Sequence, residues 1–167
     1  MSRWRSPPPK SSPYITEQGA LQLESELKAL WVRRGDVTQH LAAAAQEGDR
    51  SENAEYIYRK KELREIDRRI RYLQKRLPAL TIVRQSPDRS DRVFFGAWVT
   101  LEDPEGEQKS YRIVGADEIC PEKGWISIDA PLSRALLKRA LDEEVAVATP
   151  SGTRYWLITE IRYEPTA

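Results

Sequence analysis

Two carboxylates stand three positions apart in the segment GDRSENAEY, residues 48–56. Asp49 and Glu52 could reach one cation together, because Mg²⁺ prefers oxygen ligands and is often held by only one or two protein carboxylates. Two carboxylates are too few for a complete nuclease site, so they would complete a metal site supplied mostly by a partner. A second Mg²⁺ about 4 Å from the first would then activate a water and stabilise the leaving oxygen in phosphodiester cleavage.

The same pair also fits a purely structural role. An Asp at the N-cap of a helix with a Glu three residues later is a variant of the capping box, and negative charge suits a helix N-terminus. Ser51 is a competing N-cap residue. The local sequence leaves the capping role and the metal role open.

Two helices must position this segment. Thr16 can cap a first helix, and Pro78 ends a second. Both carry apolar residues at alternating spacings of four and three, which is the heptad seam of a coiled coil. The seam residues are Leu23, Leu27, Leu30, Val37, Leu41 and Ala44 in the first helix, with Arg34 in the gap, and Leu63, Ile66, Ile70, Leu73 and Leu77 in the second.

The two seams predict an antiparallel hairpin. Pairing Leu23 with Leu73 and Leu41 with Ile57 places its midpoint between Gly48 and Asp49. The carboxylates therefore belong to the tip of the hairpin, at residues 48–53.

Basic residues gather on the second helix. Between Arg59 and Arg76 there are nine basic residues against three acidic ones. A solvated helix face is one interpretation, and a face for a polyanion is the other. Not all of these side chains can share a face, and we expect RNA contacts from the subset that continues toward the tip, together with the tip arginine: Arg50, Lys60, Lys61, Arg64, Arg68 and Arg71.

The second half of the chain changes its period from helix to strand. Apolar residues alternate in 93–101, 111–113, 126–128, 145–147 and 155–163, and DPEG (103–106) and PSG (150–152) are typical turns. A short helix is expected over Leu132–Leu141. The fold class is α+β, with a disordered Pro/Ser tail at 1–12, a coiled-coil hairpin at 13–83 and a small antiparallel sheet domain with one helix at 84–167.

Composition excludes several classes of protein. The single Cys120 rules out an internal disulfide framework and fits a reducing cytosol, and one His with one Cys argues against a classical zinc site. No apolar run approaches the ~18 residues of a membrane span, and the N-terminus has no apolar signal-peptide core. We expect a cytoplasmic protein with no membrane partner.

In the segments quoted below, the chain resembles the bacterial Gre transcript-cleavage (transcription elongation) factors, and their B type in particular. The resemblance covers most of the chain from Ser12 to Pro165. The matching segments are SPYITEQG (12–19), GDRSENAEY (48–56), ELREIDRRIRYL (62–73), VFFGAWV (93–99), YRIVGADEI (111–119) and ISIDAPLSRALLKR (126–139). One departure follows the last segment, where the family usually has Gly-Asp and this chain reads ALDEE (140–144).

The resemblance implies an FKBP-like fold for the sheet domain, which would dock on RNA polymerase, and a coiled coil that enters the polymerase's secondary channel. By motif position, Asp49 and Glu52 would help to hold the second catalytic Mg²⁺, jointly with the polymerase. The polymerase would then cleave the nascent RNA 3′ end in backtracked complexes. The chain would act as a monomeric accessory factor and not as an enzyme itself.

Three other functions remain open on the sequence. The chain could be a secondary-channel regulator without cleavage activity. It could be a prolyl isomerase, although a fold alone does not carry a function. It could also be a structural coiled-coil adaptor, in which case the tip carboxylates would be replaceable without effect.

Overall fold

The computed structural model describes residues 8–46, 53–84 and 91–164. Its contacts divide the chain into two compact units. One is the helical unit, Ala20–Leu80. The other is the globular unit, in which Met1–Gly19 joins Thr81–Ala167. The division falls near the boundary at 83/84 that the sequence suggests, but it assigns the segment before Ala20 to the globular unit.

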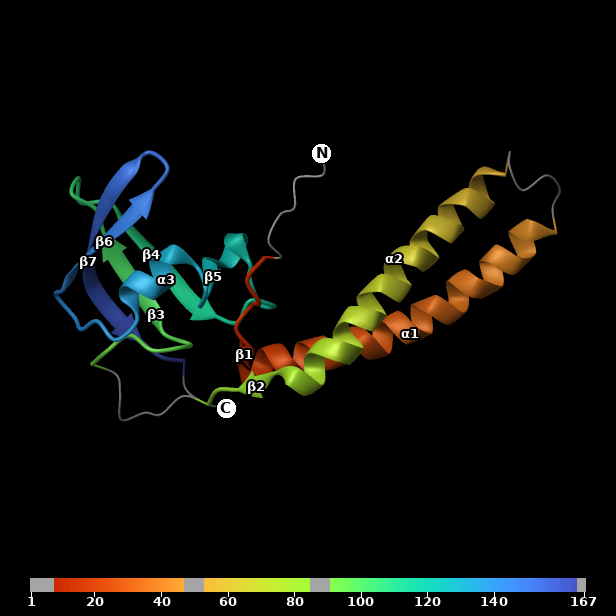
Figure 1. Ribbon diagram of the computed structural model, residues 1–167, viewed down its shortest axis with the longest axis horizontal. Helices are drawn as coiled ribbons and strands as arrows, with labels where there is room; N and C mark the ends of the chain where they lie inside the picture. The colour runs from red at the N-terminus through yellow and green to blue at the C-terminus, as the bar shows by residue number, and fades with distance from the viewer. Residues whose placement is uncertain (1–7, 47–52, 85–90, 165–167) are drawn as a thin grey trace, which may run out of the picture. The chain divides into compact units, whose positions relative to one another are not determined.

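The helical unit is an antiparallel pair of long helices, α1 (Glu17–Ala45) and α2 (Ala54–Arg76), with a 3₁₀ turn at Leu77–Ala79 (Figure 1). The heptad seam is confirmed as its core. Val37, Ile66 and Ile70 are buried together, and the partly buried residues packed against them are Leu27, Leu30 and Leu63. The core is only one seam wide, so polar contacts between the helices also matter for how they pair.

Within the described parts of α1 and α2, three ion pairs join the helices across the edges of this seam. Arg34, which interrupts the apolar pattern, places its Nε 2.7 Å from Oδ1 of Asp67. The other two pairs are Arg33–Glu62 and Arg69–Glu26, each at 2.6 Å. All three are partly exposed, so each adds at most about 1 kcal/mol of stability. Their main effect is to fix the register of α1 against α2.

One residue predicted to pair across the seam near the tip is not buried. Ile57, expected to face Leu41, is 54% exposed. Ala44, at the end of α1, is nevertheless buried, and the side-chain amide of Asn53 donates to its carbonyl at 2.8 Å.

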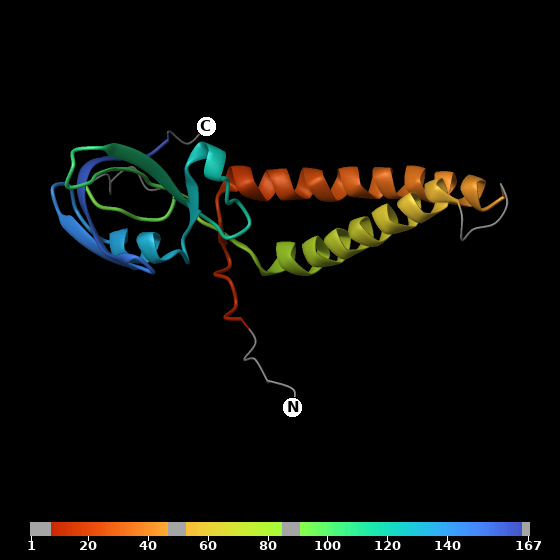
Figure 2. The same cartoon turned by 90° about the horizontal axis from the view of Figure 1, so that it is seen from above.

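The globular unit is a curled five-stranded sheet with one helix, the α+β architecture that the sequence predicts (Figures 1 and 2). The strands are β3 (Trp98–Glu102), β4 (Gln108–Val114), β5 (Trp125–Ser127), β6 (Glu144–Thr149) and β7 (Gly152–Arg162), in the order β5-β4-β3-β7-β6. All pairings are antiparallel except β4 with β5, which is parallel. Val99, Leu101, Ile113 and Ile158 are fully buried in its core with Leu136 of the helix α3 (Pro131–Leu136).

Two expected elements differ from the structure. Residues 93–97 alternate like a strand, but Gly96 has a φ of 86° and the N–H of Ala97 bonds to the carbonyl of Phe94, so the chain turns there. The expected helix over Leu132–Leu141 stops at Leu136, because Leu137 leaves the helical region with a ψ of 133° and Lys138 adopts a φ of 70°.

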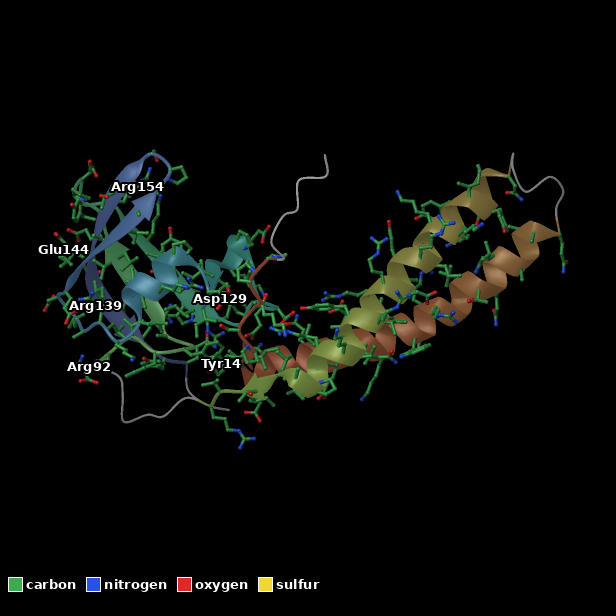
Figure 3. The ribbon with its side chains drawn as sticks, viewed as in Figure 1. Tyr14, Arg92, Asp129, Arg139, Glu144 and Arg154 are labelled. Carbon is green, nitrogen blue, oxygen red and sulfur yellow. The ribbon has the colours of Figure 1, made fainter. Side chains whose placement is uncertain are left out.

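The segment 12–16 is tied into the globular unit. β1 (Tyr14–Ile15) pairs in parallel with β2 (Thr81–Ile82), a two-stranded sheet that joins the segments flanking the hairpin. Ser12 donates to Asp129, labelled in Figure 3, through its N–H at 2.8 Å and through its hydroxyl. Thr16 caps α1 as expected, since its hydroxyl accepts the N–H of Gly19 at 3.0 Å.

Within the described residues, no helix has the length and apolar character needed to cross a membrane.

Candidate functional site

The tip carboxylates fall outside the described residues. Asp49, Arg50 and Glu52 belong to the segment 47–52, which connects the end of α1 at Ala45 to the start of α2 at Ala54. The placement of these three side chains therefore stays a prediction. The described residues on either side show which structural role these three side chains do not have to fill.

Asn53 is the N-cap residue of α2. Its backbone is extended (φ −83°, ψ 100°), and its side-chain oxygen accepts the N–H of Tyr56 at 3.1 Å. An N-cap residue satisfies a backbone donor that has no partner within the helix. The alternative in which Asp49 or Ser51 caps α2 is therefore wrong, because the helix begins one residue after Asn53. Asp49 and Glu52 precede the cap, and the capping role is already filled without them.

Two basic residues of α2 are held by acids. Arg59 contacts Glu55 at 2.9 Å and Glu62 at 3.1 Å, and Arg69 contacts Glu26 of α1. The hydrogen bond to Glu55 is the main cause of a raised pKa at Arg59. Burial of Glu62 opposes its charge, but hydrogen bonds from Arg33 and Arg59 outweigh this and lower the pKa of Glu62. These cations stabilise the hairpin and are not free to meet a polyanion.

A second group of cations on α2 has no acid partner among the described residues. It forms one exposed row at spacings of three and four, on the side of the helix away from the seam. We call this row the outer α2 line: Lys61, Arg64, Arg68, Arg71 and Lys75.

The outer α2 line contains four of the residues predicted to bind RNA. Lys60, the fifth predicted residue on this helix, lies one position to the side, where its ammonium is 5.8 Å from the ring centre of Tyr56. Lys75 was not predicted. Its signal was available, because it continues the spacing of Arg64, Arg68 and Arg71 by four more residues. The outer α2 line is a row of positive charge from Lys61 to Lys75, on the side of the helix away from the seam.

A metal site of three or more His, Cys, Asp or Glu side chains does not occur in the ranges 8–46, 53–84 and 91–164. The donor set proposed for Mg²⁺, two carboxylates at the tip, lies outside those ranges. Its chemistry suits a hard cation that a partner also coordinates.

Comparisons with known proteins match both units of the chain to one family. The family model for the C-terminal domain of the transcription elongation factors GreA and GreB matches residues 87–163. The model for the N-terminal domain of these elongation factors matches residues 13–82. The two models together cover both units of the chain.

Two curated relatives support the family that the models indicate. "Transcription elongation factor GreB" of Pseudomonas aeruginosa is 56% identical over 166 residues, 99% of each chain. The protein of the same name from Haemophilus influenzae is 58% identical over 154 residues, 92% of this chain and 98% of its own. The crystal structure of GreA factor homolog 1 from Thermus thermophilus is 25% identical, covers 89% of this chain and 97% of its own, and has a TM-score of 0.40. The chain therefore belongs to the GreA/GreB family of transcription elongation factors.

Proposed function

We propose that this elongation factor binds RNA polymerase, inserts its helical hairpin into the secondary channel and stimulates Mg²⁺-dependent cleavage of backtracked RNA. The observation that carries the proposal is the cap of α2. Asn53 fills the structural role that could have explained the acidic segment, so Asp49 and Glu52 are available for chemistry at the end of the hairpin.

The polymerase would provide the reaction centre, and the chain would provide two sets of side chains. Asp49 and Glu52 would hold Mg²⁺ together with the polymerase, and the ion would polarise the phosphodiester and activate a water. The outer α2 line, with Arg50 and Lys60 beside it, would bind phosphates of the extruded RNA. Two carboxylates cannot form a nuclease site alone, so the chain would be an accessory factor that works as a monomer in the cytoplasm with the polymerase.

The test is RNA cleavage in purified backtracked elongation complexes. We expect the intact protein with Mg²⁺ to shorten the RNA from its 3′ end faster than the polymerase does alone. Binding to polymerase without faster cleavage would identify a secondary-channel regulator instead. Absence of binding, combined with isomerisation of a proline peptide above background, would identify a prolyl isomerase.

The outer α2 line gives a second prediction. Arg68→Gln should weaken binding to backtracked complexes and reduce the slope of log affinity against log salt by about 0.7, because each phosphate contact with a single strand releases counterions. Arg69→Gln is the matched control. It removes the same charge from the neighbouring residue, but that charge is paired with Glu26, so the slope should not change. Equal slopes for the two variants would contradict RNA binding by this line.

A further inference from the structure

The two outward sides of the hairpin differ in character. On α1, the residues that occupy the positions equivalent to the outer α2 line are all exposed. We call them the outer α1 line: Leu21, Ser25, Lys28, Val32, Gly35, Gln39 and Ala42. This line carries one charge in seven residues, whereas the equivalent positions of α2 are all cations from Lys61 to Lys75, with the apolar Ile57 and Ala54 continuing the row toward the tip.

Three charged residues of α1 face α2 and not the outer α1 line. Glu26, Arg33 and Arg34 all form their ion pairs with α2, across the edges of the seam. The outward side of a solvated helix is ordinarily polar and charged. The outer α1 line instead exposes apolar side chains, with Leu21 at 60% and Val32 at 69%. Trp31, next to Val32, is 48% exposed.

Gly35 follows Val32, the central residue of this line, and has no internal reason to be glycine. Glycine is less favourable than alanine inside a helix. A Cβ at Gly35 would meet nothing within 4 Å, and its φ is not in the left-handed region. Neither packing nor backbone geometry within the chain requires the missing side chain. Gly35 does leave the helix backbone open to close approach from outside, one turn from Val32.

We infer that the outer α1 line, centred on Val32 and Gly35, docks against a protein surface, which we identify as the wall of the RNA polymerase channel. This inference rests on the proposed function. A nucleic acid would be a poor occupant, because Lys28 alone could offset its phosphates. A neutral, partly apolar protein surface matches the exposed Val32 and the bare backbone at Gly35. The hairpin would then be two-sided, with protein against α1 and RNA against α2.

The test compares two substitutions on the outer α1 line in the full chain. Gly35→Ala should raise the melting temperature of the free protein, because the helix gains propensity. It should also weaken binding to core polymerase about tenfold, because a methyl group enters a close contact at the centre of an interface. Val32→Gln should weaken binding by a similar factor while leaving the fold intact. A variant that is more stable but binds less tightly cannot be explained by a structural role for Gly35.

Gln74→Ala is the matched control. Gln74 is exposed on α2, so alanine there favours the helix without touching the outer α1 line, and native affinity is expected. The salt dependence of binding should be the same for Gly35→Ala, Val32→Gln and the native protein, because no charge is removed. A smaller salt slope in either variant would show phosphate contacts on α1 and overturn the inference.

Three further outcomes separate this inference from the proposed function. If the native chain does not bind polymerase, the proposed function fails and the inference fails with it. If the native chain binds and stimulates cleavage, and both α1 variants keep native affinity, only the inference fails. If sedimentation shows that the native chain is a dimer and Val32→Gln is a monomer with unchanged polymerase binding, the line contacts a second copy and the inference is wrong.

Discussion

Replacing Asp49 by Asn, or Glu52 by Gln, is expected to lower stimulated RNA cleavage by about tenfold to a hundredfold, as for the loss of groups that support a bound metal. Each substitution keeps the size of the side chain and removes its charge. Polymerase binding should persist, because the outer faces of α1 and α2 are unchanged. The measurement is the cleavage rate in backtracked complexes at saturating factor, with Mg²⁺ titrated; a higher Mg²⁺ requirement is expected in both variants.

The structure makes this prediction separable from a loss of folding. Asn53 caps α2, so neither tip substitution should change the melting temperature, whereas Asn53→Ala should lower helix stability by about 1 kcal/mol. Asp36→Asn and Glu65→Gln are matched controls, because they remove single exposed carboxylates from α1 and α2 away from the tip. If the tip variants cleave at the native rate, the metal role of Asp49 and Glu52 is wrong.

The hairpin could be predicted from the sequence because its core has a simple period. The seam through Val37, Ile66 and Ile70 follows directly from the heptad spacing. The cap of α2 could not be chosen in the same way. Asp49, Ser51 and Asn53 are all good N-cap residues within one short segment, and the local pattern favoured Asp49. Asn53, which forms the cap, also donates a hydrogen bond to the carbonyl of Ala44 in the other helix. This contact between helices cannot be recognised from the local sequence.

The sheet was predicted less completely, for physical reasons. Alternation is a sound signal for β4 and β7, but residues 93–97 alternate equally well, and the turn there depends on the left-handed backbone at Gly96. The parallel pairing of β5 with β4 joins segments separated by a 3₁₀ turn at Pro121–Lys123. Such a pairing cannot be predicted from the residue pattern of either strand alone.

Glu118 is the residue whose role sequence reasoning missed most completely. Its carboxylate is buried and accepts hydrogen bonds from the backbone N–H of Thr16 at 3.1 Å and of Gly115 at 2.8 Å. It also accepts the hydroxyl of Thr16. A carboxylate beside the first turn of α1 is favoured by the helix dipole. Thr16 and Glu118 are 102 residues apart in the chain, so only the fold brings these two together.

Glu118→Ala should therefore destabilise the globular unit by about 3 kcal/mol, because two buried backbone N–H groups lose their acceptor. Glu118→Gln should recover only part of this loss, since its amide NH₂ would face groups that are themselves donors. The measurement is chemical unfolding followed by tryptophan fluorescence. Glu122→Ala is the control, because Glu122 is an exposed carboxylate on the same connection.

Gly19 extends this prediction to a coupled pair. A Cβ at Gly19 would overlap the carboxylate of Glu118 and lie 2.8 Å from its Cγ, so Gly19→Ala should also destabilise the unit. In the double variant Gly19→Ala/Glu118→Ala, the carboxylate that the added methyl group would overlap is absent. The combined loss should be smaller than the sum of the single losses by about 1 kcal/mol or more, as for residues in direct contact.

Simple additivity would contradict the overlap of Gly19 with Glu118. Gly35 provides the internal comparison, because the same substitution in the same helix meets open space and should stabilise. Two glycines of α1 thus carry opposite predictions. At Gly19 a buried carboxylate of this chain leaves no room for a side chain. At Gly35 the space beside the backbone is left open for a partner.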